Sequence, residues 1–389
     1  MALNTRGMQA LARRDFVVAV DFFARAAAAD PTAPPLWINL ATARRGAGDD
    51  EGERAALLKA LSLDQRHLTA NLRLAELHER LGERAQAAHR WGGVLALAAA
   101  LPEVPPTLHE RLGHARAYVA DVGEAFGKAL EKGLAKARSG LAARELRRFD
   151  ACVDTVLGRR RIYANECEGL HFPFLPADEF FDREFFPWLS EIEAKTDVIR
   201  AEFEGLLQDG LDGFSPYVEM DAGTPQNKWT ALDHSLDWSA LHLWRHGERI
   251  ETACRRCPET AALLECVPRS HVPGRMPTAF FSVLRPRTHL PAHNGVTNSR
   301  AIIHLPLIVP EGCRFRVGGE TREWKAGEAW AFDDTIEHEA WNDSGELRAI
   351  LIFDTWNPHL TEAEQSLLRA FFEASDASGF NPATSTTEG

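Results

Sequence analysis

The stretch Arg314-Phe315-Arg316-Val317-Gly318-Gly319-Glu320-Thr321-Arg322-Glu323-Trp324 decides the fold of the carboxy-terminal half of this 389-residue chain. Two short β-type runs flank a Gly-Gly pair, which is the signature of a tight β-hairpin. Similar runs at Thr278–Leu284, Ala301–Val309, 328–332 and 346–356 are separated by glycine and proline. Many short strands with tight turns and no helices between them predict a β-sandwich or a closed barrel rather than a parallel α/β sheet.

Two histidines stand at either end of much of this strand-like sequence. One is in His293-Asn294-Gly295 and the other, 45 residues later, is in Asp333-Asp334-Thr335-Ile336-Glu337-His338-Glu339. A small β-barrel can bring two such imidazoles to one metal ion. Arg348 lies ten residues further on, in the apolar run Leu347–Phe353, and a buried strand rarely holds a guanidinium without an anionic partner. Two imidazoles for iron and one arginine for a dicarboxylate fit a 2-oxoglutarate-dependent oxygenase.

The composition is that of an ordinary soluble protein, with 45% hydrophobic and 26% charged residues. A formal net charge of −12 argues against a general nucleic-acid binder, because phosphate binding needs an excess of lysine and arginine on one face. No stretch approaches the roughly 20 apolar residues that a membrane-spanning helix requires. Residues 1–6 lack the basic start of a secretory signal, and no apolar core follows them. We therefore expect a cytoplasmic protein without a membrane span.

The six cysteines are too few and too scattered for a disulfide framework. Cys254 and Cys257 have the spacing of zinc ligands, and Cys266 is near, but no second Cys/His pair completes a tetrahedral set. The two arginines between Cys254 and Cys257 favour a plain helix. We interpret these cysteines as reduced structural thiols, with a zinc site as the alternative.

The amino-terminal third of the chain repeats itself at a period of 34 residues. The registers that agree are Leu40 and Leu74, Ala41 and Ala75, Ala26 with Ala60 and Val94, Phe23 with Leu57 and Trp91, and the turn glycines Gly48 and Gly82. The pattern resembles a tetratricopeptide array, with bulky residues on the packed face and small ones where helices cross closely. One helix pair cannot cover its own apolar stripe, so the units must stack. The alternative is a generic helical bundle.

We predict a multidomain α + β protein, an all-α tetratricopeptide-like solenoid followed by a β domain. The predicted segments are repeats over 1–100, a helical cap and linker over 101–162, the β domain over 163–375 and a disordered tail over 376–389. Prolines at 102, 105 and 106 break the helical pattern, and further helices pass through Val119, Ala129 and Leu146 to end near Gly158. Stacked helices present a groove that could dock a peptide or protein partner. The alternative is that the array only supports the β domain or a dimer.

Several motifs of the β domain resemble the aspartyl/asparaginyl β-hydroxylase family. They are His293–Arg300, His304–Leu307, Trp324–Glu328, Phe332–Asp334, Glu337–Asn342 and Phe353–Trp356. The resemblance covers roughly residues 165 to 370, and the motifs are closely spaced over about 280 to 360. It implies a double-stranded β-helix (jelly-roll) fold that uses Fe(II) and 2-oxoglutarate to hydroxylate the β-carbon of Asp or Asn residues. Some members of that family also carry tetratricopeptide repeats.

Carried over residue by residue, the resemblance makes His293 and His338 the iron ligands. Most related oxygenases add a carboxylate two residues after the first histidine. Here that position is Gly295, a departure that the family shares, and the resemblance implies a water molecule in its place. Asp333 or Asp334 could supply the missing carboxylate. Their position four or five residues before His338 instead favours a place in a turn or a contact with the metal ligands rather than with the metal.

The same resemblance implies the 2-oxoglutarate site. Arg348 would pair with the distal carboxylate through both arms of its guanidinium, and Ser282 would add a hydroxyl. His304 would bond the carboxylate next to the keto group. Arg300 shares the strand parity of His304 and would bind either the cosubstrate or an acidic substrate. The family's second arginine is Ile302 here, which removes one anion contact and leaves the substrate class open.

Some of these residues could instead have purely structural roles. His304 could be an ordinary core histidine, and Arg348 could form a strand-edge salt bridge with Glu346 or Asp354. Segments Pro216–Trp244 and Arg269–Arg275 are expected to face the substrate, which we expect to be a peptide or protein docked by the repeats. One alternative is the same chemistry on a free or carrier-bound amino acid or a lipid-linked acyl chain. Another is a non-catalytic scaffold with a degraded barrel.

Overall fold

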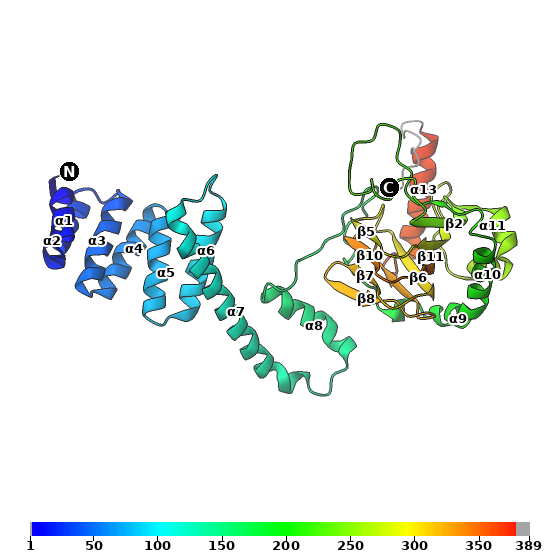
Figure 1. The fold of residues 1–389 in the computed structure, drawn as a ribbon, viewed down its shortest axis with the longest axis horizontal. Coiled ribbons are helices and arrows are strands. Elements are labelled where there is room, and N and C mark those ends of the chain that lie inside the picture. Colours follow the sequence, from blue (N-terminus) through cyan, green and yellow to red (C-terminus); the bar gives the residue numbers. More distant parts are fainter. Residues whose placement is uncertain (1, 379–389) are drawn as a thin grey trace. The chain divides into compact units, whose positions relative to one another are not determined.

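The computed structural model describes residues 2–378 and has two compact units, which divide between Leu157 and Gly158 (Figure 1). The first unit is entirely helical, and the second is built on two β-sheets. Predicted boundaries at 100 and 162 bracket a pair of helices that belongs to the first unit. Of the predicted tail at 376–389, residues 379–389 lie outside the described residues, while Asp376 and Ala377 are the end of a helix.

The first unit consists of antiparallel helices with short connections. Their bounds are α1 Ala2–Ala12, α2 Phe16–Ala29, α3 Pro34–Ala47, α4 Asp50–Leu63, α5 Leu68–Arg80, α6 Arg84–Ala99, the short 3₁₀ helix Pro106–Leu108, α7 His109–Arg138 and α8 Ala143–Val156. Helices α2, α4 and α6 begin 34 residues apart, as do α3 and α5. The predicted repeat is therefore confirmed at the level of whole helices.

The repeated residues form the core of the helical unit. Phe23, Leu57 and Trp91 stand at equivalent positions of α2, α4 and α6, and all three are buried. A Cβ on Gly7 would lie 2.7 Å from the Phe23 ring, so α1 and α2 cross as closely as the small residue allows. Gly48 and Gly82 end their helical segments with φ of 75° and 74°, a left-handed conformation that favours glycine. Local turn chemistry and the packing period thus agree.

Up to Ser378, the second unit contains short helices and eleven strands. The helices are the 3₁₀ turn Arg183–Phe185, α9 Leu189–Glu193, α10 Thr196–Gln208, α11 Glu251–Arg256, α12 Pro258–Cys266 and α13 Glu362–Ala377. The strands are β1 Ser215–Pro216, β2 Trp238–Arg245, β3 Glu248–Arg249, β4 Ala279–Leu284, β5 Thr288–His293, β6 Arg300–Ile308, β7 Cys313–Val317, β8 Glu320–Glu323, β9 Trp330–Phe332, β10 His338–Asn342 and β11 Arg348–Trp356.

The strands form two antiparallel sheets. The larger has the order β1-β2-β4-β11-β6-β9, with β3 also paired to β2, and the smaller has the order β5-β10-β7-β8. The predicted hairpin is confirmed, because Val317 pairs with Glu320 across Gly318-Gly319. Pro291 lies in β5, which pairs with β10 and with no other strand of residues 2–378. An edge strand tolerates a proline because one side of its backbone makes no ladder hydrogen bonds.

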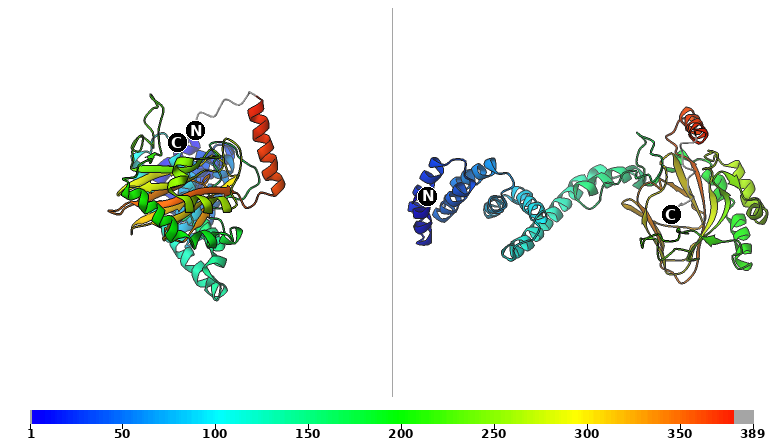
Figure 2. Two further views of the ribbon diagram at one scale, coloured as in Figure 1. Left: turned by 90° about the vertical axis from the view of Figure 1, so that its right-hand side faces the viewer. Right: turned by 90° about the horizontal axis from the view of Figure 1, so that it is seen from above.

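The central strands of the larger sheet are buried on both faces. Phe281, Leu351 and Ile303 point into a core shared with α9 to α12, which cover that face (Figure 2). The alternate residues of the same strands, such as Ser282 and Ile350, point to the opposite face, toward the smaller sheet. Polar residues on this second face therefore enter a space that is closed by protein on both sides. That space holds the candidate site.

Two further expectations concern residues away from that space. Cys254 and Cys257 are buried free thiols near the junction of α11 and α12, and Cys266 is exposed. Within residues 2–378 no three His, Cys, Asp or Glu side chains are grouped as metal ligands, so the zinc alternative has no support. The same part of the chain contains no helix with the length and apolar character needed to cross a bilayer.

Candidate functional site

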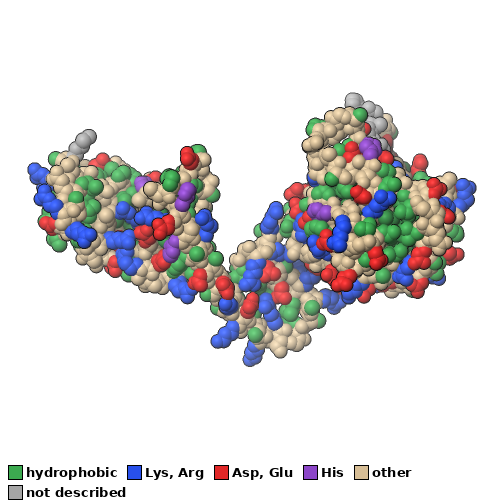
Figure 3. All heavy atoms as spheres, in the orientation of Figure 1, with side chains coloured by type: hydrophobic (Ala, Val, Ile, Leu, Met, Phe, Trp, Pro, Cys, Tyr) green, Lys and Arg blue, Asp and Glu red, His purple; other side chains and the backbone are tan. Residues whose placement is uncertain are grey.

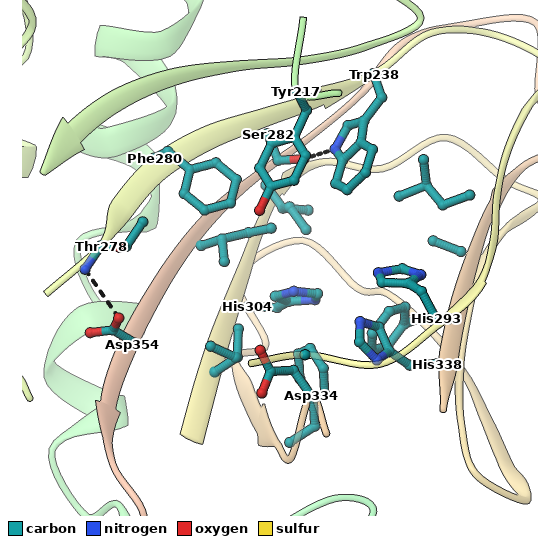
Figure 4. A pocket seen from close by; sticks show the side chains of 18 of the residues that line it. Tyr217, Trp238, Thr278, Phe280, Ser282, His293, His304, Asp334, His338 and Asp354 are labelled. Atoms are coloured by element: carbon teal, nitrogen blue, oxygen red, sulfur yellow. Dashed lines mark hydrogen bonds between the residues drawn. The ribbon is translucent and has the colours of Figure 1, made fainter. Parts of the chain in front are cut away.

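A cavity between the two sheets contains all six residues predicted to bind metal or cofactor. Counted with its open mouth, it has an empty volume of about 980 Å³. The predicted residues that line it are Ser282, His293, Arg300, His304, His338 and Arg348. They come from strands β4, β5, β6, β10 and β11, which converge here from both sheets (Figure 4).

The two candidate metal ligands are direct cross-strand partners. His338 of β10 pairs with His293 at the end of β5, and their ring centroids are 4.0 Å apart. The Nδ1 atom of His293 donates to the Pro291 carbonyl at 2.7 Å, and that of His338 donates to the Ile336 carbonyl at 3.0 Å. Because each Nδ1 carries the proton, each Nε2 keeps a lone pair that can bind a metal ion.

Burial keeps both imidazoles neutral at pH 7. Burial lowers the pKa of His338 to about 4, although the hydrogen bond to Ile336 opposes the shift. The pKa of His293 falls well below its ordinary value, first because of burial and next because His338 is so close. A neutral imidazole is the form that coordinates metals. The pair is therefore in its ligand form without any further adjustment.

Residue 295, where the sequence comparison would place the carboxylate of a metal triad, is a glycine that has no room for a side chain. A Cβ built on Gly295 would lie 2.3 Å from the Asp334 carboxylate, so that carboxylate occupies the space that a side chain at residue 295 would take. Its Oδ1 atom is buried and has no hydrogen-bond partner among residues 2–378. Asp334 does not join the two histidines in a three-ligand group. Asp333 instead accepts bonds from Asn165 and Thr335 and stabilises the turn before β10.

Arg348 is buried in the larger sheet and has no carboxylate partner within 4.0 Å among the described residues. Its Nη1 donates weakly to the hydroxyl and carbonyl oxygens of Ser282, at 3.3 and 3.4 Å, and its Nε has no partner in that part of the chain. The strand-edge salt bridge with Glu346 or Asp354 does not form. Burial lowers the pKa of Arg348 to about 10, so it remains charged at pH 7. A buried charge of this kind calls for an anion.

His304 lines the cavity and lies against several aromatic rings. Its ring centroid is 4.7 Å from that of Phe332 and 5.0 Å from that of Phe315. Its Nδ1 atom is buried without a hydrogen-bond partner in the described chain. An ordinary core histidine satisfies its polar atoms. His304 therefore does not behave as one.

Arg300 is held between two carboxylates. Its Nη2 lies 3.0 Å from Asp334 Oδ2, and its Nη1 lies 3.7 Å from Asp354 Oδ2. Asp354 is buried and accepts from the Ser270 hydroxyl at 2.6 Å and the Thr278 amide at 3.1 Å. Burial raises the pKa of Asp354 to about 6, and Arg300 opposes the rise. Much of the charge of Arg300 is thus balanced within the protein.

Sequence reasoning missed several cavity residues. Asp354 appeared only as a possible partner of Arg348, although strand parity places it on the same face of β11 as Arg348. Trp238 was expected only to lie in a substrate-facing segment, but its Nε1 donates to the Ser282 hydroxyl at 3.2 Å. Of the two segments expected to face the substrate, the first contributes Tyr217, Trp229 and Trp238 to the lining. The second, Arg269–Arg275, contributes none and instead holds Asp354 through Ser270.

Comparison with known proteins agrees with this geometry. The aspartyl/asparaginyl β-hydroxylase family model matches residues 193–358. The human aspartyl/asparaginyl β-hydroxylase is 42% identical over 135 residues, which are 34% of this chain and 18% of that protein. The ornithine lipid ester-linked acyl 2-hydroxylase of Rhizobium tropici is 35% identical over 198 residues, covering 50% of this chain and 66% of that one. The chain thus spans less than a fifth of the human relative that it matches.

The helical unit was compared with solved structures. It aligns with the tetratricopeptide domain of Sgt2 from Aspergillus fumigatus at 18% identity and a TM-score of 0.28, over 32% of this chain and 80% of that one. The family match and the six converging residues concern the second unit, and the 34-residue helical period concerns the first. The chain belongs to the aspartyl/asparaginyl β-hydroxylase family and carries tetratricopeptide-like repeats before its hydroxylase-like domain.

Proposed function

We propose that the chain is an Fe(II)- and 2-oxoglutarate-dependent dioxygenase that hydroxylates the β-carbon of Asp or Asn residues in a polypeptide. The observation that carries the proposal is one cavity that holds both a neutral histidine pair and a buried arginine, which no carboxylate of residues 2–378 approaches within 4.0 Å. The buried polar atoms of this cavity that have no partner in the described chain include His304 Nδ1, Asp334 Oδ1 and Arg348 Nε. Unsatisfied atoms so close together are what a missing polar ligand would leave.

The residues present fit ferrous iron and a dicarboxylate. His293 and His338 would hold the metal through their Nε2 atoms, with the backbone carbonyls of Pro291 and Ile336 fixing both rings. With 2-oxoglutarate and oxygen bound, the iron supplies the oxidation that decarboxylates the cosubstrate and transfers one oxygen atom to the substrate. A site with two neutral ligands leaves extra coordination positions and retains its metal less tightly than a triad.

Arg348, Ser282 and His304 would bind the cosubstrate. Arg348 offers a charged anchor to the distal carboxylate, and the Ser282 hydroxyl, itself bonded by Trp238, offers a second contact. His304 is placed to contact the other carboxylate. These groups orient the cosubstrate and exclude water, because the walls around them are aromatic.

We assign Asp334 the role that the missing triad carboxylate leaves open. Its buried Oδ1 would accept a hydrogen bond from a water molecule beside the metal, while Arg300 holds its Oδ2. This arrangement keeps a carboxylate near the metal site without placing it on the strand of the first histidine. We further propose that the two sheets form the double-stranded β-helix of iron oxygenases, with the cavity as its interior.

A second candidate keeps this chemistry but acts on a lipid-linked acyl chain. Ile302 replaces the second arginine in the cavity wall, and Tyr217, Phe280 and Ile352 add apolar surface beside it. An apolar wall accommodates a hydrocarbon better than a second carboxylate. The similarity to an acyl 2-hydroxylase favours the same candidate.

Succinate formation tests the proposed chemistry without a known substrate. Protein purified without oxygen, loaded with Fe(II) and then given 2-oxoglutarate and air, is expected to form succinate slowly. The His338→Ala variant should lose both this activity and Fe(II) binding by at least about 100-fold, since one of two protein ligands is gone. His289→Ala is the matched control, because His289 stacks on Trp341 outside the cavity. Equal succinate formation by the two variants would refute the proposal.

A further inference from the structure

A second group of polar side chains lines the cavity, apart from the histidine pair and from the end that holds Arg348. This group, the Arg300 cluster, consists of Thr278, Arg300, Asp334 and Asp354. Two isoleucines lie between Arg348 and Asp354 on the inward face of β11, so apolar side chains separate the cluster from the proposed cosubstrate anchor. The cluster therefore faces a different part of the cavity.

The Arg300 cluster carries one negative charge in excess. Arg300 is its cation and lies between Asp334 Oδ2, at 3.0 Å, and Asp354 Oδ2, at 3.7 Å. Burial raises the pKa of Asp354 to about 6, which still leaves this carboxyl mostly ionised at pH 7, and Arg300 opposes the rise. Within residues 2–378 no other lysine, arginine or histidine comes within 4.0 Å of either carboxylate. The single guanidinium thus balances only one of the two acids.

Residue 302 explains why the second acid stays unbalanced. In the register of β6 and β11 the isoleucine at this position is the direct partner of Asp354. Paired residues of neighbouring strands lie on the same face, so a basic side chain at residue 302 would face the Asp354 carboxylate, and Ile302 does not balance it. On the outer face of the second unit in Figure 3, by contrast, acidic and basic side chains are mixed and open to solvent. Charges on that surface are screened by salt more strongly than charges inside the cavity.

Two buried atoms of the cluster lack a hydrogen-bond partner in the described chain. They are Thr278 Oγ1 and Asp334 Oδ1, on residues that are each 7% exposed. In Figure 4 Asp334 lies between Asp354 and the histidine pair, and the Thr278 amide donates to Asp354 at 3.1 Å. A carboxylate oxygen only accepts hydrogen bonds, whereas a hydroxyl both donates and accepts. A ligand that satisfies both atoms must therefore donate a hydrogen bond to Asp334.

A carboxylate is a poor match for this cluster, and a primary amide is a good one. A substrate carboxylate would be a third acid beside one guanidinium, at a place where burial strengthens the repulsion between like charges. It would also bring no donor for Asp334. A cationic group would instead face Arg300. A primary amide is uncharged, donates through its NH2 group and accepts through its oxygen.

We infer that the Arg300 cluster selects an asparagine side chain over an aspartate side chain at the position to be modified. The amide NH2 donates to Asp334 Oδ1, which keeps a second lone pair for the proposed water, and the Thr278 hydroxyl donates to the amide oxygen. The amide is bonded to the β-carbon, so this contact keeps that carbon near the histidine pair. The inference rests on the proposed function and narrows its substrate class to asparagine in a polypeptide, with Thr278 and Asp354 as specificity-determining residues.

Two synthetic peptides test the inference in the full chain without added iron. One is acetyl-Gly-Ala-Asn-Ala-Gly-amide, and the other has Asp in place of Asn. Titrations followed by the NMR signals of the peptides give both dissociation constants at pH 7.5. The Asn peptide should bind at least about tenfold more tightly, because a site built from hydrogen-bonding groups rejects an analogue that leaves them unpaired.

Thr278→Val tests the hydroxyl contact. The variant should bind the Asn peptide about fivefold more weakly and the Asp peptide as wild type does. It removes a buried hydroxyl that has no partner in the described chain, so the stability of the fold should not fall. An unchanged affinity for the Asn peptide would overturn the assignment of Thr278.

Asp354→Asn tests the charge argument through a gain of binding, which a folding defect does not produce. Removing the excess charge should tighten the Asp peptide by at least about tenfold, and Ile302→Arg, which places a cation opposite Asp354, should do the same. Asp343→Asn is the matched control, because Asp343 also pairs with an arginine, Arg314, but is exposed and lies outside the cavity. It should change neither affinity.

The outcomes separate this inference from the proposed chemistry. Equal binding of the two peptides, tighter binding of the Asp peptide, no binding of either by the wild-type chain, or equal effects of Asp354→Asn and Asp343→Asn would overturn the inference. Wild-type protein that forms succinate but does not prefer the Asn peptide would refute the inference alone. Wild-type protein that prefers the Asn peptide but forms no succinate would refute the chemistry alone.

Discussion

The helical repeats and the β cavity differ in whether a buried charged side chain has an ionic partner within the protein. In the repeats, Glu53 is buried at a position that a small residue occupies in the adjacent repeats. Arg80 of the next helix forms ion pairs with Glu53 and with Asp50. In the cavity, Arg348 is equally buried, and no carboxylate of the described chain reaches it. The carboxylate of Glu53 therefore has its ionic partner within the folded chain. The guanidinium of Arg348 would gain an ionic partner only when an anionic ligand binds, and this difference points to the cavity as the site of chemistry.

The largest effect should come from removing the unbalanced charge. Arg348→Met replaces the guanidinium with an apolar side chain of similar length, so 2-oxoglutarate affinity should fall by about 100-fold. The free energy of unfolding of the ligand-free protein should stay the same or rise by about 1 kcal/mol, because a buried charge without a partner is lost. Calorimetric titration with 2-oxoglutarate and urea unfolding measure the two quantities. A large loss of stability would show that Arg348 is a structural residue like Arg80.

The next effect concerns the contact between Gly295 and Asp334. Gly295→Ala places a Cβ 2.3 Å from the Asp334 carboxylate, so something must shift, and we expect the free energy of unfolding to fall by about 2 to 3 kcal/mol. Adding Asp334→Ala should recover most of that loss, since the overlapping group is gone. Thermal and urea unfolding of both single variants and the double variant complete the cycle. Additive losses would mean that the two residues do not compete for the same space.

A smaller effect should appear as the pH falls. Burial lowers the pKa of His242 from 6.5 to about 4, with Arg245 and His246 adding to the shift. The unfolded chain therefore takes up this proton first, so the stability that neutral His242 provides is complete above pH 6.5 and is lost between pH 6.5 and 4. Allowing for its partial exposure, the loss should be on the order of 2 kcal/mol. Urea unfolding at several pH values should show a weaker dependence in His242→Phe, and an unchanged dependence would assign the loss to other groups.

The smallest effect belongs to the repeats. Gly82 ends α5 with φ of 74° and has open space where a Cβ would be, so Gly82→Ala should cost only about 1 kcal/mol, from backbone strain alone. Thermal unfolding measures the change, and Gly92→Ala within α6, which also has open space but a helical backbone, should be neutral or stabilising. An equal loss in both variants would point to packing rather than to backbone conformation.

The fold features predicted from sequence are those that depend on nearby residues. The 34-residue period, the Gly318-Gly319 turn and the parity of Arg300 and His304 on one strand are all local, and the structure contains each of them. Strands β5 and β10 were not foreseen as strands, although they carry the two histidines. Both are short, and Pro291 argues against a strand unless its edge position is already known.

The missed part of the site depends on long-range register. Asp354 meets Arg300 because β11 lies beside β6, and nothing near Asp354 in the sequence indicates which arginine it will face. The missing partner of Arg348 is likewise a property of the whole cavity, since Glu346 and Asp354 are close in sequence and do not reach it. Resemblance to a family named the six candidate residues, while only the packed structure showed which of their atoms lack partners.

The Asp334 carboxylate occupies the space that a side chain at residue 295 would take, and this affects how relatives of this chain are recognised from sequence. A search pattern that demands an acidic residue two places after the first histidine would pass over this protein, although a carboxylate stands in the same small volume. That acid arrives from the turn before β10, 39 residues further along the chain. Under the proposed function, pattern searches for iron oxygenases should therefore accept a glycine at that place when an aspartate precedes the second histidine by four residues.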